Sequence, residues 1–369
     1  MTRQAYVHRI ATRAPDDVAG LEGLLASGAI RAPGVVAILG KTEGNGCVND
    51  FTRGFASRAL KDLLRRHLPE AEAEAVCIVM SGGTEGALSP HIVVFERRDV
   101  EGAAEPGALA LGRARTAALA SEHLGRLEQV DAVAAAVRAA MADAGFVDPA
   151  EVHFVQIKCP LLTLDRIAAA QARGAATATR DPLKSMGLSR AASALGVGVA
   201  LGEIARETLT DEAIGRDWSR YSARASASAG VELLDHEIVV LGAAPGWRGP
   251  LRIAHGVMAD SIDVEPVRAA LASLGLAAPG QLPPSERGRL VALLAKAEAG
   301  STGRLRGARH TMLDDSDISA TRHARGFVAG ALAGLVGHAE LYVSGGAEHQ
   351  GPDGGGPVAV IATAARSLP

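Results

Sequence analysis

Short runs of aliphatic and β-branched residues alternate along this chain with turns rich in glycine, serine and charged residues. Six such runs occupy residues 35–39, 76–80, 91–95, 237–241, 341–343 and 358–362. Apolar runs of this length that are bounded by turn residues predict strands.

Longer stretches rich in alanine and leucine lie between these runs, and their length and composition predict helices. They cover residues 53–67, 130–144, 161–173, 190–208 and 325–336. Strands flanked by such helices predict an α/β (α+β) fold. Because only 3% of the residues are aromatic, the core must be built from Val, Leu, Ile and Ala.

One short pattern, Ser-Gly-Gly-x-Glu, occurs three times, each time before a predicted strand. Its copies begin at Ser81, Ser228 and Ser344, and the middle copy has Ala229 in place of the first glycine. A lysine precedes each serine at the end of an apolar run, and an arginine lies between the two. The lysines are Lys41, Lys158 and Lys296, and the arginines are Arg53, Arg190 and Arg325. The successive arginines are 137 and 135 residues apart, which favours duplication over chance.

The repeat divides the chain into three similar sheet-plus-helix units. We expect these units to be arranged with pseudo-threefold symmetry around one central active site. Their predicted bounds are residues 1–105, 106–252 and 253–369. Two linker-like segments rich in Gly, Pro and Ala, residues 101–107 and 244–250, set these bounds.

The charge balance argues against nucleic-acid and membrane partners. Lys and Arg number 38 against 41 Asp and Glu, so the chain lacks the dense basic field that such partners need. Small molecules are the expected partners. Three cysteines without Cys-x-x-Cys spacing predict neither a disulfide framework nor a thiolate zinc site, and with no export signal in view we expect a cytoplasmic protein.

The repeated lysines, arginines and serines are the candidate chemistry. Serine becomes a nucleophile when a base removes its proton, and lysine can be that base when burial or nearby positive charge lowers its pKa. A Ser-Lys pair is one variant of nucleophilic acyl chemistry. Backbone N–H groups of the Ser-Gly turns and the guanidinium groups could hold carbonyl oxygens. A threefold arrangement therefore predicts a ligand with three similar polar edges.

Four long motifs are distributed over the chain. They are Gly40–Asp50, Met80–Gly86, Met312–Asp317 and Ser344–Pro352. Together they closely resemble the cyanuric acid hydrolase and barbiturase family, over essentially the whole chain. The resemblance implies three similar domains around one active site that opens a cyclic amide ring. For cyanuric acid, with three carbonyl and three N–H groups, it implies hydrolysis to carboxybiuret, which loses carbon dioxide to give biuret.

The resemblance implies a role for each repeated residue. Ser228 would be the nucleophile and Lys158 its general base, while Lys41 and Lys296 would complete a charged ring. The substrate cradle would comprise Arg53, Ser81, Gly82, Arg190, Ser228, Ala229, Arg325, Ser344 and Gly345.

The middle unit departs from the pattern. Lys41 and Lys296 are each followed two residues later by a glutamate, whereas Lys158 is followed by Pro160. Ala229 likewise stands where the other copies have glycine. These departures are consistent with a distinct role for the middle serine and lysine.

The resemblance also implies a structural divalent cation, Mg²⁺ with Ca²⁺ as the alternative, near the last serine turn. Its ligands would be Glu298 and the backbone around Ala347, Gln350, Gly351, Pro352 and Gly355. Oxygen ligands of this kind suit a hard cation. The family further implies a homotetramer, and it indicates specificity residues near the third arginine, for which Thr321 is the candidate.

Other functions remain open. Barbiturase activity, which opens barbituric acid to ureidomalonate, would use the same machinery on a related ring. A noncatalytic protein that binds a cyclic imide would keep the cradle without turnover. The plainest alternative is a tandem duplication whose turns keep Ser and Gly for backbone geometry alone.

Overall fold

The computed structural model describes residues 1–364, which form three sheets of four main strands each. The first sheet contains β1 (Thr2–Ala11), β2 (Val35–Thr42), β3 (Cys77–Gly82) and β4 (His91–Val100). The second contains β5 (Leu109–Arg115), β6 (Val152–Pro160), β7 (Ala225–Gly230) and β8 (Glu237–Ala243). The third contains β10 (Leu251–Met258), β11 (Leu290–Ala297), β14 (Tyr342–Gly345) and β15 (Gly356–Thr363). The remaining strands are β9 (Trp247–Arg248), β12 (Arg304–Leu305) and β13 (Ala308–Arg309).

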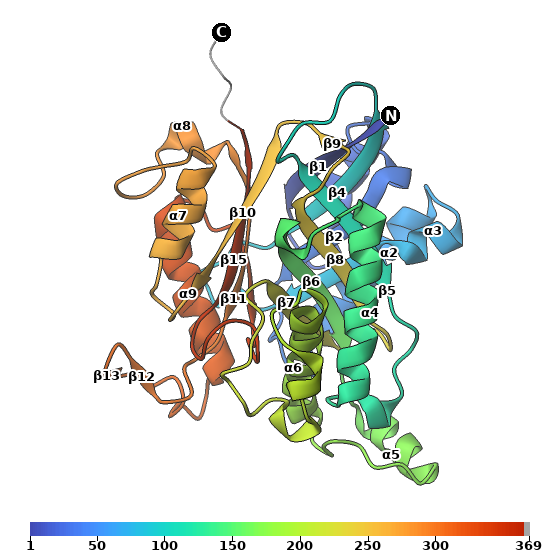
Figure 1. Cartoon of the computed structure of the whole chain (residues 1–369), viewed down its shortest axis with the longest axis vertical. Helices are drawn as coiled ribbons and strands as arrows, with labels where there is room; N and C mark the ends of the chain where they lie inside the picture. Colours follow the sequence, from blue (N-terminus) through green and yellow to red (C-terminus); the bar gives the residue numbers. More distant parts are fainter. Residues whose placement is uncertain (365–369) are drawn as a thin grey trace.

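All three sheets have the same topology, and Figure 1 shows where most of their strands lie in the molecule. The strand orders are β1-β4-β2-β3, β5-β8-β6-β7 and β10-β15-β11-β14. In each sheet the last strand lies between the first two and runs antiparallel to both. The second and third strands are parallel neighbours. The fold is thus mixed α/β and consists of three similar units, as the repeat predicts.

Each unit has one helix between its first and second strands and another between its second and third. The first set is α1 (Ala19–Ala26), α4 (Leu127–Ala144) and α7 (Glu265–Ser273), and the second set is α2 (Phe51–Arg65), α6 (Pro182–Ala200) and α9 (Ala320–Val336). Three further helices are α3 (Glu70–Ala75), α5 (Leu164–Ala172) and α8 (Pro284–Arg287). Short 3₁₀ turns are η1 (Ala32–Gly34), η2 (Ser121–His123), η3 (Pro149–Glu151), η4 (Arg206–Thr208) and η5 (Asp211–Ala213).

The predicted helix over residues 190–208 is wrong in its bounds. The helix α6 begins eight residues earlier, where the Asp181 carboxylate accepts hydrogen bonds from the first backbone N–H groups and Pro182 occupies the first helical position. An aspartate cap followed by proline is a strong start signal. The helix ends at Ala200, before Gly202 takes a left-handed conformation with φ of 72°. Arg190 therefore lies in the middle of its helix instead of opening it.

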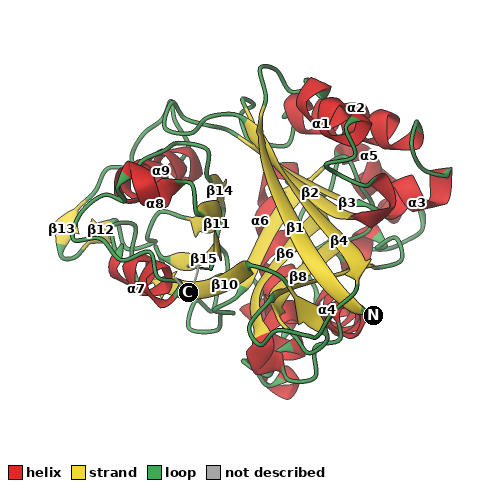
Figure 2. Cartoon of the chain, turned by 90° about the horizontal axis from the view of Figure 1, so that it is seen from above, coloured by secondary structure: helices red, strands yellow, loops and turns green. Residues whose placement is uncertain are grey.

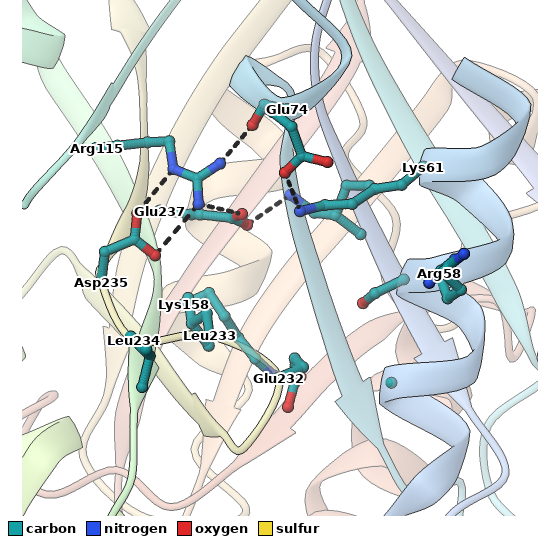
Figure 3. A pocket seen from close by; sticks show the side chains of 13 residues that line it. Arg58, Lys61, Glu74, Arg115, Lys158, Glu232, Leu233, Leu234, Asp235 and Glu237 are labelled. Atoms are coloured by element: carbon teal, nitrogen blue, oxygen red, sulfur yellow. Dashed lines mark hydrogen bonds and ion pairs between the residues drawn. The ribbon is translucent and has the colours of Figure 1, made fainter. Parts of the chain in front are cut away.

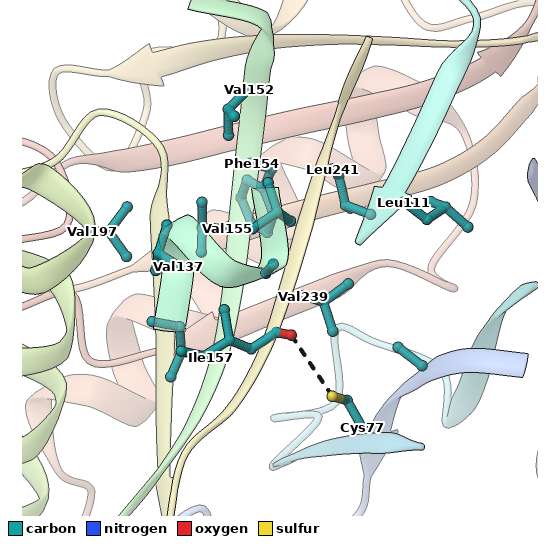
Figure 4. Close-up of a cluster of buried hydrophobic side chains, with 14 of the residues drawn as sticks. Cys77, Leu111, Val137, Val152, Phe154, Val155, Ile157, Val197, Val239 and Leu241 are labelled. Carbon is teal, nitrogen blue, oxygen red and sulfur yellow. Dashed lines mark hydrogen bonds between the residues drawn. The ribbon is translucent and has the colours of Figure 1, made fainter. Parts of the chain in front are cut away.

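The sheets meet at the centre of the molecule and the main helices lie outside them (Figure 2). Every residue of β2 is buried, which is typical of strands that are covered on both faces. The largest core cluster includes residues from all three sheets, and Figure 4 shows its part around Phe154 and Val239. There the Cys77 thiol of the first sheet donates to the Ile238 carbonyl of the second at 3.7 Å. The central packing thus fixes the sheets relative to one another.

The units are joined more closely than the two predicted linkers suggest. The bound at residue 105 falls in the loop between β4 and β5, but that at residue 252 falls inside β10. Part of the second linker is strand β9, which pairs with β1 of the first unit. Its Trp247 is buried, and the indole Nε1 donates to the Ala144 carbonyl at 2.8 Å. The bounds of the units themselves stay predictions.

Candidate active site

The repeated lysine and serine lie opposite each other in every sheet. Lys41 pairs with Ser81 across β2 and β3. The same parallel register places Lys158 opposite Ser228 and Lys296 opposite Ser344. Side chains of directly opposed residues share one face of a sheet. The three pairs therefore point to the centre, where the sheets meet.

The three lysines form a closed cycle across the units. Each ammonium group donates to the carbonyl of the residue that precedes a serine of another unit. The donor–acceptor pairs are Lys41 with Val343 (2.9 Å), Lys158 with Met80 (2.7 Å) and Lys296 with Ala227 (2.8 Å). Because each lysine contacts a neighbouring serine strand, the three units build one site together.

The serines are held differently in the middle unit. Lys41 donates to Ser81 Oγ and Lys296 donates to Ser344 Oγ, both at 3.1 Å. No hydrogen bond joins Lys158 to Ser228 within residues 1–364. Instead, Ser228 Oγ shares a hydrogen bond of 2.8 Å with Ser344 Oγ. Ser228 thus lies opposite Lys158 on β6 and is linked through Ser344 to Lys296 on β11.

All nine residues predicted for the substrate cradle line one central cavity. They are Arg53, Ser81, Gly82, Arg190, Ser228, Ala229, Arg325, Ser344 and Gly345. Three further residues, Gly46, Met80 and Met186, complete its wall. Met80 contributes its backbone here, because its carbonyl accepts from Lys158 while its side chain packs in the core beside Ile38 and Ile92. The sequence pattern gives no signal for Met186, because it lies in the part of α6 that precedes the predicted helix at residue 190.

Each arginine of the cavity faces the glutamate of a Ser-x-Gly-x-Glu turn from another unit. Arg325 Nε donates to Glu85 at 2.6 Å, and Arg190 Nε donates to Glu348 at 2.8 Å. Both pairs have a second hydrogen bond through Nη2, so both are bidentate. Such pairs hold a guanidinium plane in a fixed orientation. The repeat contained these glutamates, but sequence reasoning assigned them no role.

The third pair breaks this symmetry. Glu232 Oε1 lies 3.9 Å from Arg53 Nε but only 2.7 Å from Lys158 Nζ. The Arg53 guanidinium donates instead to backbone carbonyls, including that of Cys47 at 2.7 Å. Pro160 had indicated a lysine without a carboxylate nearby in the sequence. In the folded chain Glu232 supplies one from the turn after β7.

Burial lowers the pKa of all three lysine ammonium groups, as general-base chemistry requires. Arg325 lowers the pKa of Lys41 further by charge repulsion. For Lys296, burial and then Arg190 lower the pKa to about 7. Glu232 acts against burial at Lys158, since its negative charge favours the ammonium form. The middle lysine is therefore the one whose protonation depends on a directly paired carboxylate.

The loop predicted to hold a divalent cation lies beside Glu298. The backbone N–H of Gly346 donates to the Ala297 carbonyl at 3.0 Å, which brings residues 347–355 alongside the end of β11. Burial of the Glu298 carboxyl group, and then the charge of Glu348, raise its pKa to about 7. A cation here would offset the cost of placing two carboxylates close together. One carboxylate with backbone carbonyls would suit a hard divalent ion, but the Ala347 and Pro352 carbonyls accept hydrogen bonds within the loop, so these ligands stay a prediction.

Within residues 1–364, no group of three or more His, Cys, Asp or Glu side chains is placed to hold a metal ion. The predicted cation site depends mainly on backbone carbonyls and so is of another kind. The predicted specificity residue Thr321 lies between this region and the cradle. Its hydroxyl oxygen is 3.4 Å from Glu298 Oε1. A Cβ atom at Gly345 would lie 2.6 Å from its methyl carbon.

A cavity lined by three serines and three arginines, with three buried lysines behind them, defines an enzyme that acts on a small molecule. The model of one family, described as amidohydrolase ring-opening protein, matches residues 6–363. The chain belongs to this family of ring-opening amidohydrolases and is a hydrolase. No helix in the described part of the chain is long and apolar enough to cross a membrane.

Named relatives resemble the chain over nearly its full length. A cyanuric acid amidohydrolase of Bradyrhizobium sp. (strain ORS 375) is 65% identical over 97% of this chain and 98% of its own. The crystal structure of cyanuric acid hydrolase from A. caulinodans is 62% identical, with a TM-score of 0.91 over 98% of this chain and 99% of that one. A cyanuric acid hydrolase described as evolutionary innovation by structural concatenation is 49% identical, with a TM-score of 0.94 over 99% and 100%.

Proposed function

We propose that this protein hydrolyses cyanuric acid to carboxybiuret, which loses carbon dioxide to give biuret. The observation that carries the proposal is the central cavity, which is lined by three corresponding sets of serine, arginine and turn backbone in the same strand register. Cyanuric acid presents three identical amide edges, so one ring would engage all three sets at once. The names of the relatives agree with this substrate.

In the proposed mechanism Ser228 is the nucleophile and Lys158 the general base. Lys158 takes the hydroxyl proton as Ser228 Oγ bonds to a ring carbonyl carbon. The ring C–N bond breaks, and its nitrogen takes the proton from the lysine. Water then attacks the acyl carbon, gives a proton to Lys158, and Ser228 leaves with that proton. The product is the open-chain acid, and both residues return to their starting state.

The arginines would hold the two carbonyl oxygens that do not react. The bidentate pairs with Glu85 and Glu348 fix two of the guanidinium groups before the substrate arrives. A preorganised cradle of this kind loses little free energy to reorganisation as charge develops on the ring. Lys41 and Lys296 keep the other two serines in place through their hydrogen bonds.

A divalent cation, Mg²⁺ in our proposal with Ca²⁺ as the alternative, would be held by Glu298 and the backbone of residues 347–355. Its contribution would be structural, because it would neutralise carboxylates beside the last serine turn. Removal of divalent ions with a chelator should lower the melting temperature, and Mg²⁺ should restore it. A homotetramer stays a prediction, which the native mass in solution tests.

Turnover of purified protein on cyanuric acid and on barbituric acid, measured side by side, tests the substrate. We expect loss of cyanuric acid with release of carbon dioxide and no loss of barbituric acid. Loss of barbituric acid alone would replace the proposal by barbiturase activity. Binding of cyanuric acid without turnover would replace it by a noncatalytic binding function.

A further inference from the structure

Lys158 lies between two cavities. Its register partner Ser228 lines the substrate cavity, while Lys158 itself lines a second cavity of about 410 Å³. The second cavity is bounded by α2, β3 and the turn after β7, and Figure 3 shows its lining side chains. Arg58 and Leu234 at its edge are exposed, whereas Lys158 at its inner end is fully buried. The cavity thus leads from solvent to the back of the proposed base.

Glu232 occupies the inner end of this cavity next to Lys158 (Figure 3). Its side chain is 13% exposed, and Oε1 lies 2.7 Å from Lys158 Nζ. Both carboxylate oxygens are buried, and neither has a hydrogen bond of good geometry within residues 1–364. The carboxylate thus pairs with Lys158 at the cavity wall, and a small movement of its side chain would bring it to water in the cavity.

Gly230 permits this position of the carboxylate. A Cβ atom at residue 230 would overlap Oε2 of Glu232, so only glycine lets the side chain fold back over its own turn. In the other units the corresponding glycines make room for an arginine, and Gly83 also makes room for Glu85 of its own turn. A Cβ at Gly83 would overlap Arg325, and one at Gly346 would overlap Arg190. Only in the middle unit does the glycine at this position allow the turn glutamate to contact a lysine.

We propose that this second cavity is the proton exit of the enzyme, and that Glu232 is a positioning residue that passes the proton of Lys158 to water there. The proposal rests on the proposed function, in which each turnover produces an open-chain carboxylic acid. Ionisation of this acid breaks its O–H bond. The proton goes to the Lys158 amine, then to the Glu232 carboxylate, then to a water molecule in the cavity. Each group returns to its starting state, so the step balances without a further reactant.

Charged groups from several elements surround Lys158. Glu232 from the turn after β7 favours its ammonium form, and Arg53 from α2 opposes it. Glu237 from β8 is the cross-strand partner of Lys158 and lines the same cavity. The Cys159 thiol is the remaining titratable neighbour on β6.

Chemical rescue tests the path. E232A removes the carboxylate and leaves a space that formate can reach from the cavity. We expect kcat to fall on the order of 10²-fold, as for loss of a proton-transfer group, and formate to restore a large, saturable part of it. KM for cyanuric acid should stay unchanged, and the same concentration of chloride should restore nothing.

Two matched variants test whether formate acts from the second cavity. The double variant G54L/E232A fills the cavity, because a side chain at residue 54 meets no atom within 4 Å at its Cβ and Gly54 lines the wall. We expect formate to rescue it far less than E232A. E85A removes the corresponding glutamate of the first unit, which does not line the cavity, and formate should leave its kcat unchanged.

The proposal is overturned if formate fails to rescue E232A, or rescues G54L/E232A or E85A equally well. If E232A does not fold, E232Q gives the second test. Loss of the negative charge should shift the acidic limb of the kcat/KM profile to lower pH, whereas E85Q should leave its midpoint unchanged. A uniform loss of activity without a shift would indicate a structural role. Wild-type turnover of cyanuric acid is measured first, so failure of the proposed function is seen separately.

Discussion

The outer two units and the middle unit use the same residues in different ways. In the outer units the turn glutamate holds an arginine by two hydrogen bonds, as Arg325 with Glu85 shows. In the middle unit Glu232 leaves its arginine and pairs with Lys158. The backbone register of lysine and serine is nevertheless identical in all three. The duplicated scaffold thus keeps its geometry while one carboxylate changes partner.

In the proposed mechanism this difference distinguishes one reactive pair within a symmetric site. Three equivalent lysines would share the work of binding a threefold ligand, but catalysis needs one base whose protonation is controlled separately. A single paired carboxylate is enough to make that distinction. Pro160 marks the same unit, since the glutamate that follows the other lysines is missing there.

The largest effect should come from removing the nucleophile. S228A should lower kcat by at least about 10⁴-fold, because loss of a nucleophile in a comparable serine hydrolase costs more than this. S81A and S344A remove cradle hydroxyls and should cost on the order of 10²- to 10³-fold, as for a hydrogen-bond donor to a reacting carbonyl. Steady-state kinetics on cyanuric acid measure all three.

An equal loss in the three serine variants would contradict the assignment of one reactive pair. A larger loss in S344A than in S228A would move the reaction to the Ser344–Lys296 pair, which is joined by a hydrogen bond of 3.1 Å. Binding of cyanuric acid to each variant by calorimetry is the control, because S228A should retain affinity.

Much of this site could be predicted from the sequence. The strands that carry Lys41, Ser81 and Ser344 contain short apolar runs that end at the repeated turns, whereas β7, which carries Ser228, has the sequence Ala-Ser-Ala-Ser-Ala-Gly and gives no such signal. The repeat of lysine, arginine and serine pointed to the candidate residues, and the family resemblance implied their role as a cradle. The same reasoning could not place Met186, because the start of α6 depended on the cap at Asp181 rather than on apolar periodicity.

The role of Glu232 could not be predicted, for a different reason. The sequence pattern assigns the same position to Glu85, Glu232 and Glu348. Which partner each carboxylate takes depends on distances of a few ångströms between strands from different units. Such contacts depend on side-chain rotamers in the packed molecule, and no local pattern reports them.

A second comparison concerns the residues opposite the lysines on the central strands. His91 lies opposite Lys41, and Glu237 lies opposite Lys158. Burial raises the pKa of Glu237 from 4.5 to about 7, and it lowers the pKa of His91 from 6.5 to about 4. The contribution of Glu237 to stability is complete below pH 4.5 and is lost as the pH rises through 7. That of His91 is complete above pH 6.5 and is lost as the pH falls through 4.

E237Q should therefore change the pH dependence of stability at higher pH, and H91Q should change it at lower pH. As the pH rises from 5 to 8, the free energy of unfolding of E237Q should increase relative to that of wild type by on the order of 3 kcal/mol. This follows because the folded and unfolded pKa values of Glu237 differ by roughly 2.5. As the pH falls from 7 to 4, the free energy of unfolding of H91Q should increase relative to that of wild type by a similar amount. Urea unfolding at four pH values measures both, and curves parallel to that of wild type would contradict the prediction.

The middle unit also has two long helices that pack directly together. A Cβ atom at Gly196 of α6 would lie 2.8 Å from the Val130 carbonyl and from Val133 Cβ of α4. G196A should therefore destabilise the protein by about 1–3 kcal/mol, the usual cost of overpacking. In G198A the added atom meets the flexible end of Ile204, so its effect should be close to zero. Equal melting temperatures for the two variants would show that the helices can separate at no cost.

The smallest effect should be the most specific one. G230A places a methyl group where the Glu232 carboxylate lies, and so should push that carboxylate away from Lys158 without altering either residue. We expect kcat to fall about 10-fold with KM unchanged, because the displaced group acts on proton transfer and not on substrate binding. G330A is the control for a glycine-to-alanine change, since a Cβ atom there meets no atom within 4 Å, and it should leave kcat unchanged. If G230A raises KM instead, Glu232 acts mainly through Arg53 and the cradle, and the middle unit then resembles the outer two in function as well as in backbone.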